Sequence, residues 1–346
     1  MEPVAHFLTN LCVSRAGLNR TTSLATAMMV ASAEMPDIDL LWNLGGPAAG
    51  FGAHRGFTHT LLGAPLVGAL SLAVVWLWYR LRLRLKRPPP TPPRWRRLFL
   101  YGCLGGILHI LLDFTNSYGV RPFAPFYDRW VAWDTVYIIE PVMLVILVAG
   151  LVLPSLFALI QEEVASRRML TRGRGGAVFA LIALVFFWGV RDYQHRRAVA
   201  ALEARIYQGE DPIRVSAFPY PVNPFLWYAV AETREFYASM HVNSFTATVD
   251  PEDRMEIRYK SQDTPVTLAA KDSPLGRVYM HWARYPMLEV EPISPTEGGG
   301  YLVRFYDLRY VYPEPGSRRP LQALVELDRD LRAVAEQMSG RRRLLR

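Results

Sequence analysis

The sequence predicts an α-helical membrane domain followed by a soluble antiparallel β domain, and three observations lead to this fold class. The first 190 residues contain long stretches that are nearly free of charge. Strongly basic loops join some of these stretches. After about residue 194 the chain becomes polar, with mixed charge and alternating apolar and polar side chains. In this chain of 346 residues we therefore expect two domains, residues 1–193 and residues 194–346.

The first 35 residues are predicted to form a short helical hairpin with arms at 3–14 and 21–35. Each arm is shorter than the about 17–20 apolar residues that a helix needs to cross a bilayer, which favours an interfacial or re-entrant hairpin. Pro36 ends the second arm, because proline disfavours a helical conformation in the residue before it. A Gly-rich loop, residues 45–52, follows.

Four apolar stretches approach or reach the length of a transmembrane helix. They are Leu61–Tyr79, Leu98–Leu112, Tyr137–Ile160 and Gly176–Val190. The loop 80–97 carries eight Lys or Arg side chains and no acidic one, and the loop 161–175 carries four Arg side chains. Basic loops stay in the cytoplasm. We therefore expect a multi-pass protein in which residues 34–60, residues 113–136 and the C-terminal domain lie outside the cytoplasmic membrane.

The net charge of +8 comes largely from these two loops and from the tail "GRRRLLR". Membrane orientation explains such a distribution, so we expect membrane lipid as a partner and no nucleic acid. Buried helices of a large soluble protein would not account for the charge asymmetry between the loops. The two cysteines, Cys12 and Cys103, lie in apolar surroundings and predict neither a disulfide framework nor a Cys zinc site.

The C-terminal domain is predicted from alternating patterns separated by turn residues. The segments are "SFTATVD", "RMEIRYK", "RVYMHWARYPMLEVEPI", "GYLVRFYDLRYVY" and "LQALVELD". A helix over about 328–339 is expected to close this β-rich domain.

Four of the seven histidines lie in the membrane half, where ionisable side chains are costly without partners and are functional candidates by default. In "HILLD", His109 and Asp113 are four residues apart and share one helix face, so they could bind one ion. The alternative is a histidine hydrogen-bonded to its own carboxylate. In "PDID", Asp37 and Asp39 point to the same side of an extended segment, where a cation would relieve their repulsion. A helix cap or solvated turn is the simpler explanation for that pair.

In "HRGFTH", His54 and His59 flank Arg55, and Thr58 could cap the helix that follows. The pattern leaves open which histidine binds a metal, and both could instead anchor a span at the interface. His6 by itself is more typical of a structural histidine, but the hairpin returns it to the outer side.

The predicted topology brings these side chains to one side of the membrane. The candidate metal ligands are His6, Asp37, Asp39, His54, His59, His109 and Asp113. They suffice for one closed site or two open ones, and paired metals are the usual device for phosphoester hydrolysis. We expect a divalent metal, with zinc as the first candidate and one or two ions. Arg55 could bind a phosphate with both guanidinium N–H groups, and Asn116 and Asp134 are candidates for orienting the ligands.

The ordered motifs His6, "PDID", "HRGFTH", "HILLD", "NSYG" and "PF" resemble the YdjM-like family of bacterial inner-membrane proteins. Members of this family are regarded as metal-dependent hydrolases and are related to the LexA-regulated protein YdjM. That family is itself similar to zinc-dependent phospholipase C and the nuclease S1/P1 group. The resemblance implies metal-binding roles for His6, Asp37 or Asp39, His54 or His59, His109 and Asp113. The chain lacks a later His-x-x-x-Glu pair for a third metal.

The leading hypothesis is a membrane-bound metal-dependent hydrolase that acts on an ester or phosphoester, with a lipid-linked substrate, at the outer face of the membrane. The general base would be one of Asp37, Asp39 and Asp113. The alternative is a non-enzymatic, membrane-anchored binding or assembly protein whose metal is structural. A transporter is less favoured, because a polar relay needs ionisable groups across the midplane.

Overall fold

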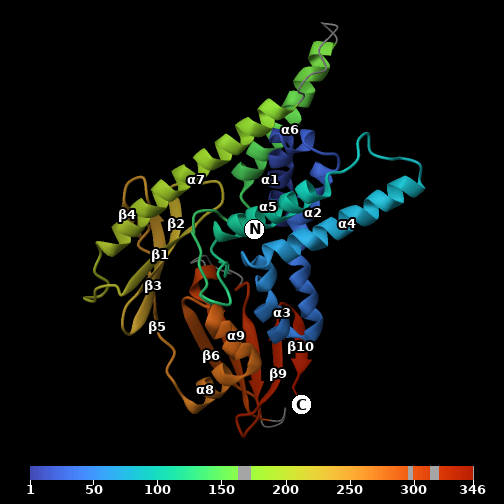
Figure 1. The fold of residues 1–346 in the computed structure, drawn as a ribbon. Helices are drawn as coiled ribbons and strands as arrows, with labels where there is room; N and C mark the ends of the chain where they lie inside the picture. Colours follow the sequence, from blue (N-terminus) through green and yellow to red (C-terminus); the bar gives the residue numbers. More distant parts are fainter. Residues whose placement is uncertain (163–172, 295–298, 312–318, 346) are drawn as a thin grey trace. The chain divides into compact units, whose positions relative to one another are not determined.

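The computed structural model describes residues 1–162, 173–294, 299–311 and 319–345 (Figure 1). The chain divides into two compact units. The first unit contains Met1–Ile38 and Arg55–Tyr193, and the second contains Asp39–His54 and Gln194–Arg346. The segment Asp39–His54 thus groups with the C-terminal residues, whereas the sequence pattern predicts one membrane domain over residues 1–193.

The first unit begins with the predicted helical hairpin. Helix α1 (Pro3–Ala16) starts at a proline, and the Glu2 carboxylate caps it by accepting bonds from the N–H groups of Val4 and Ala5. A 3₁₀ turn, η1 (Leu18–Arg20), leads to α2 (Ala25–Glu34). Residues Met35–Gly45 continue as 3₁₀ helix η2, followed by α3 (Pro47–Ala53) and the short 3₁₀ turn η3 (Phe57–His59). The hairpin prediction is confirmed.

Four longer helices follow: α4 (Ala64–Arg84), α5 (Trp95–Phe114), α6 (Pro141–Glu162) and α7 (Arg174–Glu203). Within the described part of the chain, α4, α5 and α7 are long and apolar enough to cross a membrane. A shorter apolar segment, Pro141–Pro154, forms the first part of α6. The predicted helical membrane region is therefore confirmed as a fold class.

Small residues let α5 approach both α2 and α4 closely. A Cβ atom at Gly102 would lie 2.9 Å from the Cα of Gly68 on α4, and one at Gly105 would lie 2.8 Å from the Cβ of Ser32 on α2. Real Cβ atoms do not come this close, so glycine is required for this spacing. This packing sets the distance between α2 and the end of α5 that carries His109.

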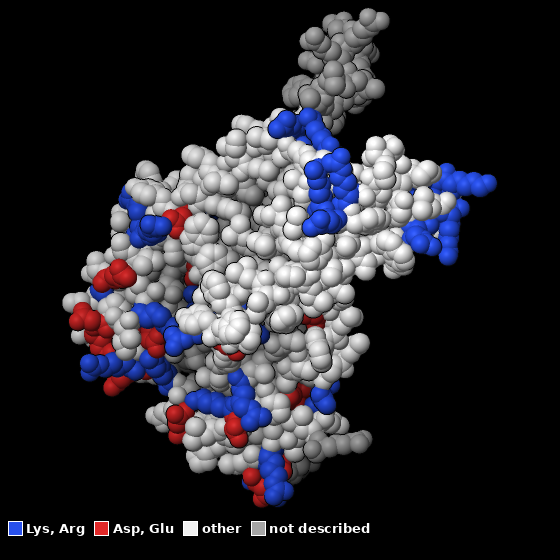
Figure 2. Space-filling model, viewed as in Figure 1, with Lys and Arg blue, Asp and Glu red and all other residues white. Residues whose placement is uncertain are grey.

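Basic side chains collect at one end of this helical unit. Arg15 donates to the carbonyl of Leu151, and Arg174 donates to that of Ala16. Arg97 donates to Thr21 in the turn of the hairpin. Figure 2 shows further Lys and Arg side chains at the far end of α4, beside a helix surface that is largely uncharged. The side chains of the candidate metal centre lie at the opposite ends of these helices.

The second unit contains two antiparallel sheets. In the described residues the first has the order β1-β2-β3-β4, with β5 also paired to β3. Its strands are Arg214–Pro219, Leu226–Glu232, Phe236–Asn243, Thr248–Val249 and Glu256–Tyr259, for β1 to β5. The second has the order β10-β9-β8-β7-β6. Its strands are Pro286–Pro292, Tyr301–Asp307, Ala323–Leu327, Ala333–Met338 and Arg341–Leu344, for β6 to β10. Helices α8 (Pro265–Asp272) and α9 (Pro274–Trp282) connect the sheets.

The antiparallel β domain is confirmed, but two local predictions within it are wrong. The expected closing helix at 328–339 is instead strand β9, which pairs with β8 and β10. The segment "RVYMHW", expected as the start of a strand, forms most of α9. Ser273 caps α9 by accepting the N–H of Gly276, and Glu336 on β9 accepts the N–H of Leu275. The local bond to Ser273 and the long-range bond to Glu336 both satisfy N–H groups at the N-terminus of α9, which favours a helix over a strand.

Candidate metal centre

Four side chains of the first unit converge at the C-terminal end of α5. His109 and Asp113 come from α5, His59 from the turn η3, and Asp37 from η2. The Nε2 atoms of His59 and His109 are 3.1 Å apart. Asp113 Oδ2 lies 3.4 Å from His109 Nε2 and 3.5 Å from His59 Nε2. Asp37 Oδ1 lies 3.4 Å from His59 Nε2 and 3.7 Å from His109 Nε2.

These separations match the edges of a tetrahedral metal site. Zinc binds imidazole nitrogen and carboxylate oxygen at about 2.0–2.2 Å, so neighbouring ligand atoms in a tetrahedron are about 3.3–3.6 Å apart. The five distances above lie between 3.1 and 3.7 Å. The donor set and its spacing therefore fit a divalent ion, and these buried groups could hold one.

Hydrogen bonds at the opposite ring nitrogens orient both histidines. His109 Nδ1 lies 2.6 Å from the carbonyl oxygen of Ala33, the penultimate residue of α2. His59 Nδ1 lies 3.2 Å from the Thr58 hydroxyl. A proton on each Nδ1 leaves Nε2 unprotonated and facing the carboxylates, which is the tautomer that binds metal. Thr58 thus contacts a predicted ligand, although as an orienting group rather than as a helix cap.

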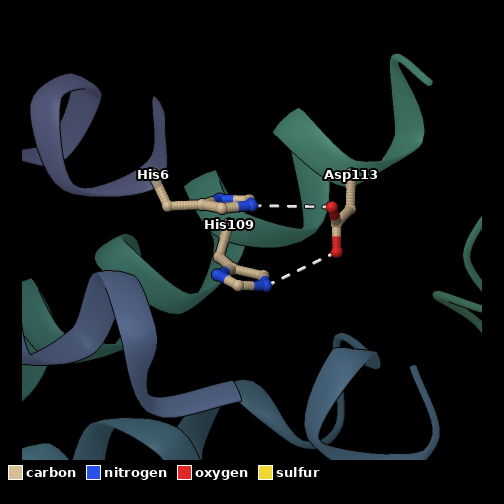
Figure 3. Close-up of side chains that lie close together, drawn as sticks. All are labelled: His6, His109 and Asp113. Atoms are coloured by element: carbon tan, nitrogen blue, oxygen red, sulfur yellow. Dashed lines mark ion pairs between the residues drawn. The ribbon is translucent and has the colours of Figure 1, made fainter. Parts of the chain in front are cut away.

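His6 extends the cluster from α1. Its ring stacks on that of His109 with centroids 3.8 Å apart, and its Nε2 lies 3.5 Å from Asp113 Oδ1 (Figure 3). The side chain is fully buried, and neither ring nitrogen has a hydrogen-bond partner among the described residues. Buried polar groups are rarely left unsatisfied. An ion beside Asp113 would satisfy His6 as well.

Arg55 neutralises Asp113 from the other side. Its Nη2 donates to Asp113 Oδ1 at 2.8 Å, and its Nη1 donates to the carbonyl of Gly119 at 2.8 Å. The guanidinium also lies over the ring of Tyr118, and the residue is 3 % exposed. Arg55 therefore anchors a predicted ligand and ties it to the loop after α5. The amino group of Met1 also contacts Asp113 Oδ1.

The protonation states suit a metal site. Burial lowers the pKa of His6 to about 3, and the neighbouring His109 acts in the same direction, so His6 is neutral at physiological pH. Burial alone would raise the pKa of Asp37, but the bond from His59 and the charges of His109 and His59 lower it below its ordinary value. Neutral imidazole and ionised carboxylate are the metal-binding forms.

Asp39 and His54 belong to the second unit and contact each other. His54 Nδ1 lies 3.2 Å from Asp39 Oδ1, and the Asp39 side chain is almost completely buried. One aspartate of "PDID", Asp37, and one histidine of "HRGFTH", His59, thus lie beside the candidate ligands on α5. The choice between His54 and His59 was open from the sequence.

The remaining candidates lie in the loop after α5. Asn116 Oδ1 accepts from Arg55 Nη1 at 3.3 Å and from the N–H of Tyr118 at 2.9 Å, so it positions Arg55. Asp134 is buried and has a left-handed backbone (φ 56°). One acidic residue was missed: Glu34, at the end of α2, has a buried Oε1 without a hydrogen-bond partner among the described residues. Its position in the sequence, three residues before Asp37, could have identified Glu34 as a candidate site residue.

The fold and the site together define a class of protein: a membrane protein with a helical unit that buries a His–Asp cluster and a β-rich unit that follows. The chain belongs to the YdjM inner membrane protein family, which it matches over residues 1–198. It is also similar to "Uncharacterized protein YfhP" of Bacillus subtilis (strain 168), with 24% identity over 316 residues. That match covers 89% of this chain and 84% of the relative, so it extends into the β-rich unit. No solved structure matches the chain significantly.

Proposed function

We propose that this protein is a metal-dependent hydrolase, with zinc as the metal, that acts on a lipid-linked phosphoester at the outer face of the cytoplasmic membrane. The observation that carries the proposal is the convergence of His59, His109 and Asp113, all at most 2 % exposed, on an Asp37 side chain that is 23 % exposed. A metal-binding set with one accessible edge is what a hydrolytic site needs, because water and substrate must reach it.

The charges of the site favour an anionic substrate. When a metal is bound, the histidines that hold it are neutral, so Asp37 and Asp113 contribute two negative charges and Arg55 one positive charge. Burial lowers the pKa of the Met1 amino group to about 6, so this group is largely neutral at pH 7. A divalent cation reverses the net charge from negative to positive, which favours binding of a phosphate ester over that of a neutral ester.

Different residues of this chain have different roles in the proposed reaction. A divalent ion, when bound, supplies Lewis acidity that activates water and stabilises charge on the phosphoryl oxygens. Asp37, at the accessible edge, would accept the proton of the attacking water on Oδ2, because its Oδ1 is the oxygen that lies beside His59 and His109. Arg55 and Asn116 hold Asp113 in place, and Ala33 and Thr58 fix the histidine rings.

The place of the cluster along α5 supports a lipid-linked substrate. Asp113 is the penultimate residue of this candidate span, which ends at Phe114. The cluster therefore lies near the depth of the lipid headgroups if α5 crosses the membrane. The basic residues at the opposite helix ends favour an orientation with the cluster on the outer side.

The proposal is tested with purified protein in lipid nanodiscs that contain radiolabelled phospholipids or a lipid-linked phosphodiester. We expect release of the phosphate-containing group, loss of this activity after chelation, and its return with zinc. Asp37→Asn should abolish release, whereas Asp128→Asn should not, because Asp128 pairs with Arg121 in the loop after α5 and its side chain is 50% exposed. Absence of hydrolysis by metal-loaded protein would refute the proposal.

A second candidate function is a membrane-anchored binding or assembly protein with a structural metal. One observation favours it: the chain itself offers four neighbouring ligand groups, His59, His109, Asp37 and Asp113, which is the number of protein ligands in a closed structural site. In that case metal removal would unfold or loosen the helical unit without any activity to lose. Thermal unfolding of metal-free and metal-loaded protein, measured beside hydrolysis, distinguishes the two functions.

A further inference from the structure

A small apolar surface of the second unit lies at the tips of two loops. Val222 and Phe225 belong to the connection between β1 and β2, and Phe245 follows β3. We call these three residues the aromatic tip. The rings of Phe225 and Phe245 pack edge to face with centroids 5.4 Å apart. Phe245 is nonetheless 66% exposed and Val222 54% exposed. Apolar side chains exposed in this way gain free energy when a partner removes them from water.

Hydrogen bonds attach the aromatic tip to a specific turn of α7. Arg197 Nε donates to the carbonyl of Ser244 at 2.9 Å, and its Nη2 donates to the carbonyl of Phe245 at 3.0 Å. The Ser244 hydroxyl donates to Gln194 Oε1 at 2.8 Å. Further along the same sheet, the carbonyl of Val249 accepts from Arg205 at 3.0 Å. The aromatic tip is therefore attached to the first turns of α7 that belong to the second unit.

The chain path limits how far the aromatic tip can be from the membrane. The apolar stretch of α7 ends at Val190, and Gln194 and Arg197 follow four and seven residues later. At a rise of 1.5 Å per residue these positions are about 6 and 10 Å beyond the end of the span. The headgroup layer on each side of a bilayer is about 5–7 Å thick. The tip is thus tethered within reach of this layer.

We propose that the aromatic tip contacts the bilayer in which α7 is anchored, with Phe245 at the boundary between headgroups and acyl chains. The partner is the lipid surface itself. Phenylalanine, unlike a charged side chain, gains free energy by leaving water at that depth. The contact restrains the β-rich unit next to the membrane and does not depend on whether the metal centre hydrolyses a substrate.

The test uses the full-length chain with both native cysteines replaced (Cys12→Ala, Cys103→Ala) and a spin label on Phe245→Cys. The labelled protein is reconstituted in nanodiscs of phosphatidylethanolamine and phosphatidylglycerol. Its accessibility to oxygen and to a water-soluble nickel complex is measured by power saturation. A matched control carries the label on Tyr259→Cys, because Tyr259 on β5 is also 66% exposed.

We expect the label at residue 245 to have severalfold lower nickel accessibility and higher oxygen accessibility than the label at 259. A label on Val222→Cys, the second exposed position of the tip, should behave like that at 245. Nickel accessibility at 245 and 222 equal to that at 259 would overturn the proposal. The proposal would also be overturned if nickel accessibility at 245 stayed the same when the nanodisc bilayer is replaced by an amphipathic polymer that keeps the protein soluble without a bilayer.

Discussion

His59 and His54 are five positions apart in one motif, yet the structure gives them different partners. His59 lies on a 3₁₀ turn that directs its Nε2 toward His109, whereas His54 Nδ1 lies beside the buried carboxylate of Asp39. Arg55, between them, has a left-handed backbone (φ 54°) that redirects the chain. A sequence pattern does not reveal such a change of direction, so residue types alone left both histidines as candidates.

His59→Ala is expected to weaken metal binding far more than His54→Ala. Removing an orienting partner of a metal ligand typically costs about 10–100-fold in affinity, and removal of the ligand itself should exceed this range. Competition with a fluorescent zinc chelator measures both variants. Equal losses of affinity in the two variants would contradict the assignment of His59.

Glu34 gives the helical unit a pH-dependent stability. Burial raises the pKa of Glu34 to about 7, and the charges of Asp37 and Glu2 act in the same direction. The folded protein therefore holds this proton more tightly than the unfolded chain. The resulting stabilisation is fully present below the ordinary pKa of 4.5 and is lost as the pH rises through about 7.

Glu34→Gln should flatten this dependence. At pH 8 the variant should be more stable than the natural chain by about 1 kcal/mol, after allowance for solvent screening of a half-buried group. For a unit of this size that corresponds to a rise of about 2–4 °C in the melting temperature. Melting curves at pH 5 and pH 8 test it, with the exposed Glu252→Gln as control. An identical pH dependence in the variant would disprove this role.

At the scale of elements, close packing of α2 on α5 positions the metal centre. Gly105→Ala introduces a Cβ 2.8 Å from that of Ser32, so the two helices must separate or rotate. Overpacking of this kind costs about 1–3 kcal/mol. It should also break the bond between His109 and Ala33 and reduce metal affinity.

Gly189→Ala is the matched control, because a Cβ at Gly189 on α7 meets nothing within 4 Å. Alanine is the better helix former, so this variant should be neutral or slightly stabilised. Melting temperature and zinc affinity are compared for both variants. Normal metal affinity in Gly105→Ala would show that α2 does not set the position of His109.

The long helices of the first unit were predictable because each contains a long apolar stretch. In a membrane such a stretch forms a helix, since a helix satisfies all its backbone hydrogen bonds internally. The spacing of His109 and Asp113 was equally readable, since i and i+4 share a helix face. Strands β2 and β3, "LWYAVAE" and "FYASMHVN", were missed. Both are buried on two faces over most of their length, so they lack the alternation of a half-exposed strand.

The error at β9 has a different cause. Its residues, "AVAEQM", include the helix formers Ala, Glu, Gln and Met. Pairing with β8 and β10 overrides this intrinsic preference for a helix, and burial of Ala335 and Met338 further stabilises the strand. Helix propensity is a weak prior that tertiary contacts routinely reverse. The sequence could not show these contacts, because they depend on which segments meet in the folded sheet.

At the scale of the whole molecule, the charge distribution predicts the orientation in the membrane. Basic side chains sit at the helix ends opposite to the His–Asp cluster. Leu44→Cys, at an 89% exposed position in the segment after Asp37, should react with a membrane-impermeant maleimide in intact cells. Arg84→Cys, at the exposed C-terminal end of α4, should react only after the membrane is opened. The reverse pattern would place the cluster inside the cell.

The central claim is that His59, His109, Asp37 and Asp113 bind a divalent metal ion. Elemental analysis of the purified full-length protein tests it most directly, beside the double variant His109→Ala/Asp113→Ala prepared in the same way. We predict near-stoichiometric zinc in the natural chain and its loss in the double variant. Metal-free natural protein that also fails to take up added zinc, or an unchanged metal content in a folded double variant, would contradict the claim.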